Sequence, residues 1–374
     1  MRRNEPGYML LGKSGAGWLF GLVLILLTIG CAADSTGRDD EISQQADGPY
    51  LGLNVPAEQP VLFAPGNVCT GRYERDMAVS ADGREIFYGM MMSEVVTILT
   101  TRQTDNGWTD PEVVEFAGDL TWRHLEPCLS PDGNRLFFLT TRPTTGEEAV
   151  AGWGCQNIFA ADRRADGGWG EPWDPGPAVN TAEFEYFPSM TRDGVMYFTR
   201  SAPRQAAAIW RARPAGRDGF LTAENIPLPA GPGESIFNAC IAPDESYLVA
   251  CVTGRADSLA EGKANYYVYF RGADDTWSEA VNLGPLVNPP GVGAVSPAIS
   301  ADGAVFFFAA QRRRPEWDSP RVQLTLALLQ RMYAAPQNGL GDIYWVSTAF
   351  ITRLRPEGRS AGKGQTYGSI GRAK

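Results

Sequence analysis

One short pattern recurs five times along this chain and limits what the chain can fold into. Each copy has an apolar segment, a turn built on Asp that is usually followed by Gly, and a second apolar or aromatic segment. The clearest copy is CLSPDGNRLFFLT at Cys128–Thr140, in which Asp132-Gly133 suits a tight turn and Phe137-Phe138 suits a strand. The five turn aspartates are Asp82, Asp132, Asp193, Asp244 and Asp302.

The spacing of these turns, roughly 50–60 residues, predicts a β-propeller. Each hairpin is followed by a further apolar segment, such as Asn157–Ala161 or Tyr266–Phe270, and then by a turn with an aromatic residue, such as Asn106-Gly-Trp108. A single four-stranded sheet cannot bury both of its faces, whereas sheets stacked around an axis can. We therefore expect an all-β propeller of five four-stranded blades, with six blades as the alternative.

The repeats resemble the WD40-like PD40 propeller repeat of bacterial envelope proteins, of which the TolB propeller is the familiar case. Trp169–Phe198 follows that repeat closely, and the resemblance covers about residues 60–355. Blade four departs from it, because Glu245 stands at the turn Gly position and Ala242 at the Ser position. The resemblance implies blades and says almost nothing about activity.

The last repeat predicts how the propeller closes. It reaches its third strand at Asp342–Val346 and shows no fourth strand after it. Pro60–Val68 resembles the strand that precedes each hairpin, so we expect it to complete the last blade and remove an open sheet edge. This interpretation assigns residues 59–355 to the propeller, 32–58 to a disordered tether and 356–374 to a disordered tail.

An insertion, Arg312–Gly339, interrupts blade five. Ser319–Ala334 is predicted to be a helix with a Ser cap and Pro at its first position. Val322, Leu326 and Leu329 recur at helical spacing, so the favoured interpretation is a helix that packs this stripe on the propeller. A partner-docking helix and a lid over the channel are the alternatives.

Residues 1–31 are predicted to be an export signal. Basic residues precede the apolar run Trp18–Ile29, which is short for a bilayer-spanning helix. Leu27-Thr-Ile-Gly-Cys31 resembles the lipobox of bacterial lipoproteins, although Thr28 stands where Leu is usual. The resemblance implies lipidation at Cys31 and, because Ala32 follows, an outer-membrane anchor facing the periplasm or cell surface. An ordinary signal peptide is the alternative.

Charge and residue types exclude several function classes. The net charge of −10 at pH 7 makes the body of the protein a poor partner for nucleic acid or anionic lipid. His124 is the only histidine, which excludes zinc sites built on several histidines, and we expect no metal and no cofactor.

The cysteines after Cys31 are predicted to be small buried residues. Cys128 and Cys240 occupy the repeat position held elsewhere by Ala or Ser, which fits close packing of the inner strands. The alternative is a disulfide between Cys240 and Cys251, on paired strands of one hairpin, which export would permit.

The runs just before the inner strands carry the candidate site, because in a propeller they lie at the mouth of the central channel. Polar residues crowd the first three runs, Tyr73–Met77, Arg123–Pro127 and Phe184–Pro188. In the alternative interpretation, Glu126 and Glu185 only satisfy backbone N–H groups of the next blade. The candidate binding residues are Glu74, Asp76, Arg123, His124, Glu126, Glu185, Tyr186 and Asn238.

Two function classes remain. The favoured one is a non-catalytic envelope lipoprotein whose propeller binds a protein, peptide or glycan at the channel mouth. The other is a glycosidase-like enzyme in which Asp76, Glu126 and Glu185 supply carboxylates from successive blades. Carboxyl separations of roughly 5–10 Å would favour the enzyme. Wide separation, or burial of the carboxylates in blade contacts, would count against it.

Overall fold

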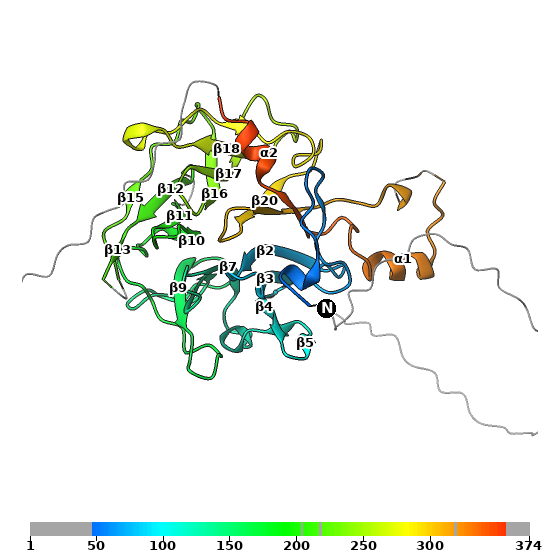
Figure 1. The fold of residues 1–374 in the computed structure, drawn as a ribbon, viewed down its shortest axis with the longest axis horizontal. Helices are drawn as coiled ribbons and strands as arrows, with labels where there is room; N and C mark the ends of the chain where they lie inside the picture. Colours follow the sequence, from blue (N-terminus) through cyan, green and yellow to red (C-terminus); the bar gives the residue numbers. More distant parts are fainter. Residues whose placement is uncertain (1–46, 203–204, 217–218, 318, 320, 357–374) are drawn as a thin grey trace, which may run out of the picture. The chain divides into compact units, whose positions relative to one another are not determined.

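The computed structural model describes residues 47–202, 205–216, 219–317, 319 and 321–356. In this part of the chain, five antiparallel sheets are arranged around an axis as a five-bladed propeller (Figure 1). Neighbouring inner strands lie against one another in chain order, and the last inner strand lies against the first. The ring is therefore closed, which confirms the all-β fold and five blades over six.

Each blade runs from an inner strand outwards. Blade one holds β2 (Tyr73–Val79), β3 (Glu85–Met92), β4 (Val95–Thr104), β5 (Gly107–Trp108) and β6 (Glu112–Val113). Blade two holds β7 (His124–Leu129), β8 (Arg135–Thr140) and β9 (Asn157–Asp162). Blade three holds β10 (Phe184–Met190), β11 (Met196–Ser201), β12 (Ala208–Ala212) and β15 (Glu224–Asn225). Blade four holds β16 (Ser235–Ile241), β17 (Tyr247–Thr253), β18 (Asn265–Phe270) and β19 (Val281–Asn282).

Blade five combines the two ends of the propeller. Its strands are β20 (Ala294–Ile299), β21 (Val305–Ala310), β22 (Asp342–Ser347) and β1 (Val61–Leu62). The remaining elements are the strand pair β13 (Pro214–Ala215) and β14 (Gly219–Phe220), the helices α1 (Leu326–Tyr333) and α2 (Ala349–Arg353), and the 3-10 turns η1 (Tyr50–Gly52), η2 (Glu115–Ala117), η3 (Ala273–Asp275) and η4 (Pro315–Trp317).

The pairing of β1 with β22 is the predicted closure. Val61 lies opposite Trp345 in antiparallel register. The next residue, Phe63, is fully buried, and its ring packs edge-on against Phe307 at 5.4 Å and Trp345 at 5.0 Å. The N-terminal strand thus covers the apolar face of blade five and removes its open edge.

The recurring motif is a hydrogen-bonded turn. In blade two the Ser130 hydroxyl donates to Asp132 at 2.6 Å and accepts the N–H of Arg135 at 2.9 Å. The same bonds form in blades one and five. Gly133 takes a φ of +71°, which a side chain would resist. The motif is therefore explained by folding of the turn.

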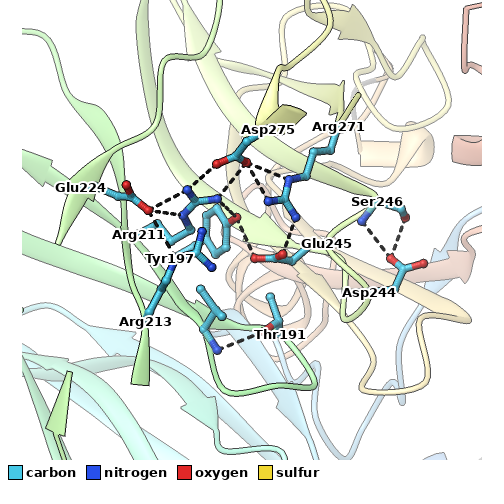
Figure 2. A network of polar contacts seen from close by, with 11 residues as sticks. Thr191, Tyr197, Arg211, Arg213, Glu224, Asp244, Glu245, Ser246, Arg271 and Asp275 are labelled. Carbon is cyan, nitrogen blue, oxygen red and sulfur yellow. Dashed lines mark hydrogen bonds and ion pairs between the residues drawn. The ribbon is translucent and has the colours of Figure 1, made fainter. Parts of the chain in front are cut away.

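Glu245, which replaces the turn glycine in blade four, holds two blades together. It adopts a left-handed φ of +56°. Its carboxylate accepts the hydroxyl of Tyr197 from blade three at 3.0 Å and pairs with Arg271 of its own blade. Arg211 of blade three adds a second link through Asp275, at 2.9 Å between Nη1 and Oδ1 (Figure 2). Glu245, the residue that departs from the repeat, is thus part of a polar network that links blades three and four.

The tether predicted for residues 32–58 ends earlier than expected. The N–H of Tyr50 donates to the carbonyl of Gly83 at 2.8 Å, and Leu51 is buried. The carbonyl of Pro56 accepts the N–H of Ser347 in β22. Residues 47–58 therefore pack on the propeller, because Tyr50 and Leu51 supply apolar side chains among polar neighbours. Cys31 and most of the predicted tail lie outside the described residues.

The predicted long helix is wrong in its bounds and in its packing. Helix α1 starts after Thr325, whose extended backbone breaks any helix from Ser319 and whose hydroxyl accepts the N–H of Leu328 at 3.1 Å. Leu326 and Leu329 are 72% and 49% exposed, so this stripe does not pack on the propeller. Figure 1 shows α1 beside the ring, beyond β20, so it is not a lid over the channel.

The five described cysteines are buried and free. Cys240 lies opposite Val249 in the hairpin, and Cys251 lies opposite Phe237. The alternative disulfide between Cys240 and Cys251 is therefore wrong, because the strand register gives each cysteine a different partner.

Candidate ligand-binding site

Every inner strand carries a β-bulge at its middle. In β2 the register with β3 shifts between Arg75 and Ala78, and the other four inner strands shift at the corresponding place. The polar runs thus lie inside the inner strands, and the expectation that they precede them is wrong. At a bulge, two residues of one strand lie opposite a single residue of the partner strand. The polar run and the apolar run that follows it are therefore parts of one continuous strand, although the sequence suggested a loop followed by a strand. The residues at the bulges are Asp76, Glu126, Phe187, Asn238 and Ser296, of which the first four have φ between +49° and +57°.

Side chains at the bulges reach the next blade. Glu126 accepts the backbone N–H of Phe187 at 2.7 Å. Asn238 donates through Nδ2 to the carbonyl of Val295 at 2.6 Å. The hydroxyl of Ser296 donates to Asp76 across the seam between blades five and one. We call these five residues the bulge ring, and its polar members connect neighbouring blades.

Arg75 joins two members of the bulge ring. Its Nε donates to Asp76 at 2.7 Å and its Nη2 to Glu126 at 3.3 Å, and its side chain is only 12% exposed. Burial, aided by the charge of Asp76, raises the pKa of Glu126, while the guanidinium opposes this rise. Since Phe187 and Ser296 occupy the other oxygens, each oxygen of both carboxylates has a partner.

A cavity of about 300 Å³ lies between the bulge ring and the inner hairpin turns. Asp76, Glu126 and Phe187 border it at the bulge ring. The rim consists of the residue just before each turn aspartate: Ala81, Pro131, Arg192, Pro243 and Ala301. The walls between are mainly apolar, with three hydroxyl residues among them: Met77, Ala78, Val79, Pro127, Cys128, Leu129, Ser130, Pro188, Ser189, Met190, Thr191, Cys240, Ile241, Pro297, Ala298 and Ile299.

Each rim residue of this cavity is followed in the chain by an aspartate. The five turn aspartates are all exposed and directly follow the rim residues. The hydrogen bond from Ser130 is the largest effect on Asp132 and holds the pKa of that carboxyl below its usual value. Arg192 is the one basic residue among the described residues that line the cavity.

Two predicted site carboxylates are held inside their own blades. Glu74 is fully buried and accepts the hydroxyl of Thr70 at 2.5 Å. Glu185 is also fully buried and accepts Nε of Arg200 at 2.7 Å and the hydroxyl of Thr181 at 2.6 Å. Glu185 does not bond to the next blade as the alternative interpretation expected, and neither residue lines the cavity.

His124 is a core residue. It is 2% exposed, and its ring lies 6.0 Å from Phe116 and 5.5 Å from Phe138. Burial lowers its pKa to about 4, so the ring is neutral at physiological pH.

The remaining predicted residues are dispersed. Arg123 lies 5.0 Å over the ring of Trp153, pairs with Glu94 and borders a separate cavity. Tyr186 packs on a small cluster containing Leu125. Asn238 belongs to the bulge ring. Of the eight predicted residues, the structure places only Asp76 and Glu126 on the central cavity.

The apolar wall of the cavity was not predicted from the sequence. Pairs such as Cys128-Leu129 and Cys240-Ile241 stand just before the turn motif in their repeats, and both pairs line the cavity. Their fixed place between the bulge and the turn was the available signal, and it was interpreted only as strand packing.

The described residues lack two further features. No three His, Cys, Asp or Glu side chains are grouped so that they could hold a metal ion. None of the helices there has the length and apolar character needed to cross a membrane.

No protein-family model matches the chain, and no curated protein matches it. Solved structures do. TolB from Acinetobacter baumannii is 12% identical, with a TM-score of 0.39 over 73% of this chain and 54% of TolB, so the match spans about half of that protein. An α-L-arabinofuranosidase from Lactobacillus brevis is 12% identical, with a TM-score of 0.44 over 75% and 91% of the two chains. A protein of unknown function from Dyadobacter fermentans is 12% identical, with a TM-score of 0.42 over 69% and 80%. Similarities this distant assign neither a family nor an activity.

Proposed function

We propose that this protein is a non-catalytic binding module of the cell envelope, and that its cavity takes a short apolar peptide segment flanked by basic residues. One observation carries the proposal: a cavity enclosed by five inner strands has mainly apolar walls, and each of its five rim residues is followed in the chain by an exposed aspartate. Burying an apolar side chain against such walls is favourable. The five exposed aspartates attract basic neighbours of that side chain and repel anionic partners.

The wall chemistry favours a peptide over a glycan. Aliphatic, Pro, Met and Cys side chains make up most of the lining, and Phe187 is the one aromatic residue among the described lining residues. Sugars stack on aromatic faces and need many polar partners, and these walls offer one aromatic ring and few polar side chains. An aliphatic peptide side chain needs neither of these.

The carboxylates of the bulge ring support a non-catalytic role. A glycosidase needs one carboxyl that protonates the leaving group and one that attacks or activates water. Asp76 and Glu126 already engage all four oxygens in contacts with Arg75, Phe187 and Ser296. The third carboxylate of that mechanism, Glu185, is buried away from the cavity.

Selection from a displayed library of short random peptides tests this proposal. We expect the enriched sequences to combine aliphatic residues with Lys or Arg. In one variant, Asp82, Asp132 and Asp302 are changed to Asn, which keeps the oxygen that accepts the hydrogen bond in each turn and removes the charge. Binding should then weaken about tenfold or more. Asp105→Asn, at an exposed outer turn of blade one, is the matched control and should leave binding unchanged.

The outcomes separate this proposal from the enzyme. Selected peptides that are acidic, or that bind the triple variant as well as the parent, would overturn the peptide site. Release of sugar from an arabinan or xylan substrate, abolished by Glu126→Gln, would support the glycosidase instead.

The envelope location in this proposal rests on the sequence alone. Cys31→Ser should give an unprocessed or soluble periplasmic form, since the acylated residue is lost. If the Ser variant fractionates with membranes as the parent does, lipidation at Cys31 is wrong.

A further inference from the structure

Helix α1 presents an apolar stripe that the propeller does not cover. Leu326, Leu329 and Tyr333 are spaced i, i+3 and i+7, so they lie on one face of the helix. They are 72%, 49% and 76% exposed, and Leu324 just before the helix is 64% exposed. Isolated exposed apolar residues are ordinary, but four of them on one short segment form a patch that marks an interaction surface.

The exposure of this stripe does not come from a loose loop. At the base of the insertion, the N–H of Gly339 donates to the carbonyl of Arg312 at 3.0 Å and the N–H of Arg314 to that of Gln337 at 2.9 Å. Asn338 donates to the carbonyl of Gly71, ahead of blade one, at 2.8 Å. The base is therefore attached to the propeller, and α1 is held out from it with the stripe facing away.

The charge of this segment is opposite to that of the rest of the protein. Residues 321–340 contain two arginines, Arg321 and Arg331, and no Asp or Glu, in a chain whose net charge is −10. Both arginines are exposed. In the whole insertion, residues 312–339, three further arginines, 312–314, stand against Glu316 and Asp318, so the insertion is still net positive. An anionic surface is therefore repelled by the body of the protein and attracted to this segment.

We propose that residues 321–340 dock on an anionic lipid bilayer, with Leu326, Leu329 and Tyr333 entering the headgroup region. An apolar stripe with Tyr at its end and Arg beside it is the pattern of helices that lie in the bilayer interface. The insertion joins the end of β21 to the start of β22, on the side of the propeller where the inner strands begin. The cavity rim is formed where the inner strands end, so docking leaves the rim free.

Photocrosslinking in the full chain tests this docking. A photoreactive phenylalanine analogue replaces Leu329, and in a matched control it replaces Leu221, which is 55% exposed on blade three. Each protein is reconstituted with vesicles of phosphatidylethanolamine and phosphatidylglycerol, or of phosphatidylcholine alone. Adducts are identified by mass spectrometry, and near-ultraviolet circular dichroism checks that each variant is folded.

We expect lipid adducts at position 329 in the phosphatidylglycerol vesicles and few at position 221. Changing Arg321 and Arg331 to Gln should lower the yield roughly tenfold, because two attractive charges near the surface are lost. Equal yields at 329 and 221, or a yield indifferent to the arginines, would overturn the proposal. Adducts between two copies of the chain would assign the stripe to a protein interface instead. If the variant at Leu329 does not fold, the same comparison is made at Tyr333.

Discussion

Glu126 in blade two accepts the backbone N–H of Phe187 in blade three at 2.7 Å, and both residues have a left-handed backbone. The bulge turns this N–H away from the ladder of its own sheet. Without the carboxylate it would be a buried donor with no partner, which costs about 1–3 kcal/mol. The glutamate therefore offsets the cost of the bulge and at the same time connects two blades.

This contact predicts that the main contribution of Glu126 is to the stability of the fold and not to binding. Glu126→Ala leaves the N–H of Phe187 without an acceptor and removes one of the two carboxylates that pair with Arg75, so the free energy of unfolding should fall by about 2–4 kcal/mol. Glu126→Gln keeps one acceptor oxygen and should lose less than half as much. Urea titrations of the three proteins measure both differences. An Ala variant within about 0.5 kcal/mol of the parent would show that Glu126 is not a structural link.

The fold was predictable because its determinants are local. The Ser-x-Asp-Gly turn, as in Ser130–Gly133, is folded by bonds among residues a few positions apart, so each copy marks one hairpin. The closing strand β1 was predictable because an open blade needs a fourth strand and only one unused segment fitted.

The candidate site was less predictable because it depends on the bulges. A polar run followed by an apolar run suggested a loop and then a strand, yet Asp76 and Val79 belong to one strand that bends between them. Helical spacing shows that apolar residues share one face of a helix, but not what that face contacts. The exposure of Leu329 could therefore not be predicted from the spacing.

At Glu245, backbone strain lowers the stability of the fold while side-chain contacts raise it, and the two effects can be measured separately. Its φ of +56° is unfavourable for any residue but Gly by about 1 kcal/mol, while its carboxylate holds Tyr197 and Arg271. Glu245→Ala loses the contacts and keeps the strain, whereas Glu245→Gly loses both. We expect the Gly variant to be about 1 kcal/mol more stable than the Ala variant, with both below the parent in denaturant titrations. A Gly variant more stable than the parent would mean that the network in Figure 2 adds less than the strain removes.

Closure by β1 predicts that the buried ring of Phe63 provides much of the stability gained where β1 joins blade five. Phe63→Ala removes contacts with Phe307 and Trp345 and leaves a cavity, so it should lower the free energy of unfolding by about 3–5 kcal/mol. Val61→Ala, on the same strand but 45% exposed, is the matched control and should cost less than about 1 kcal/mol. Thermal melts followed by circular dichroism measure both changes. Similar losses for the two variants would argue against burial of Phe63 as the source of closure.

His124 predicts how stability depends on acid pH. Burial lowers its pKa to about 4 from the ordinary 6.5, so the folded protein binds fewer protons than the unfolded chain between these values. Its contribution is therefore complete above pH 6.5 and is lost as the pH falls towards 4, by about 1.4 kcal/mol per pH unit. Asp342, whose pKa burial raises to about 7, contributes the opposite slope, so the parent's own curve mixes both effects.

Comparing the parent with His124→Phe isolates the histidine. Phe fits an aromatic site between Phe116 and Phe138 and leaves no buried ring nitrogen, which His124 has at both positions without a hydrogen bond. The difference in unfolding free energy, measured by urea titration at several pH values, should be flat above pH 6.5. Below that value it should grow in favour of the Phe variant as the pH falls to about 4. A difference that stays constant across this range would show that His124 is protonated as easily in the folded protein as in the unfolded chain, and its assignment as a neutral core residue would be wrong.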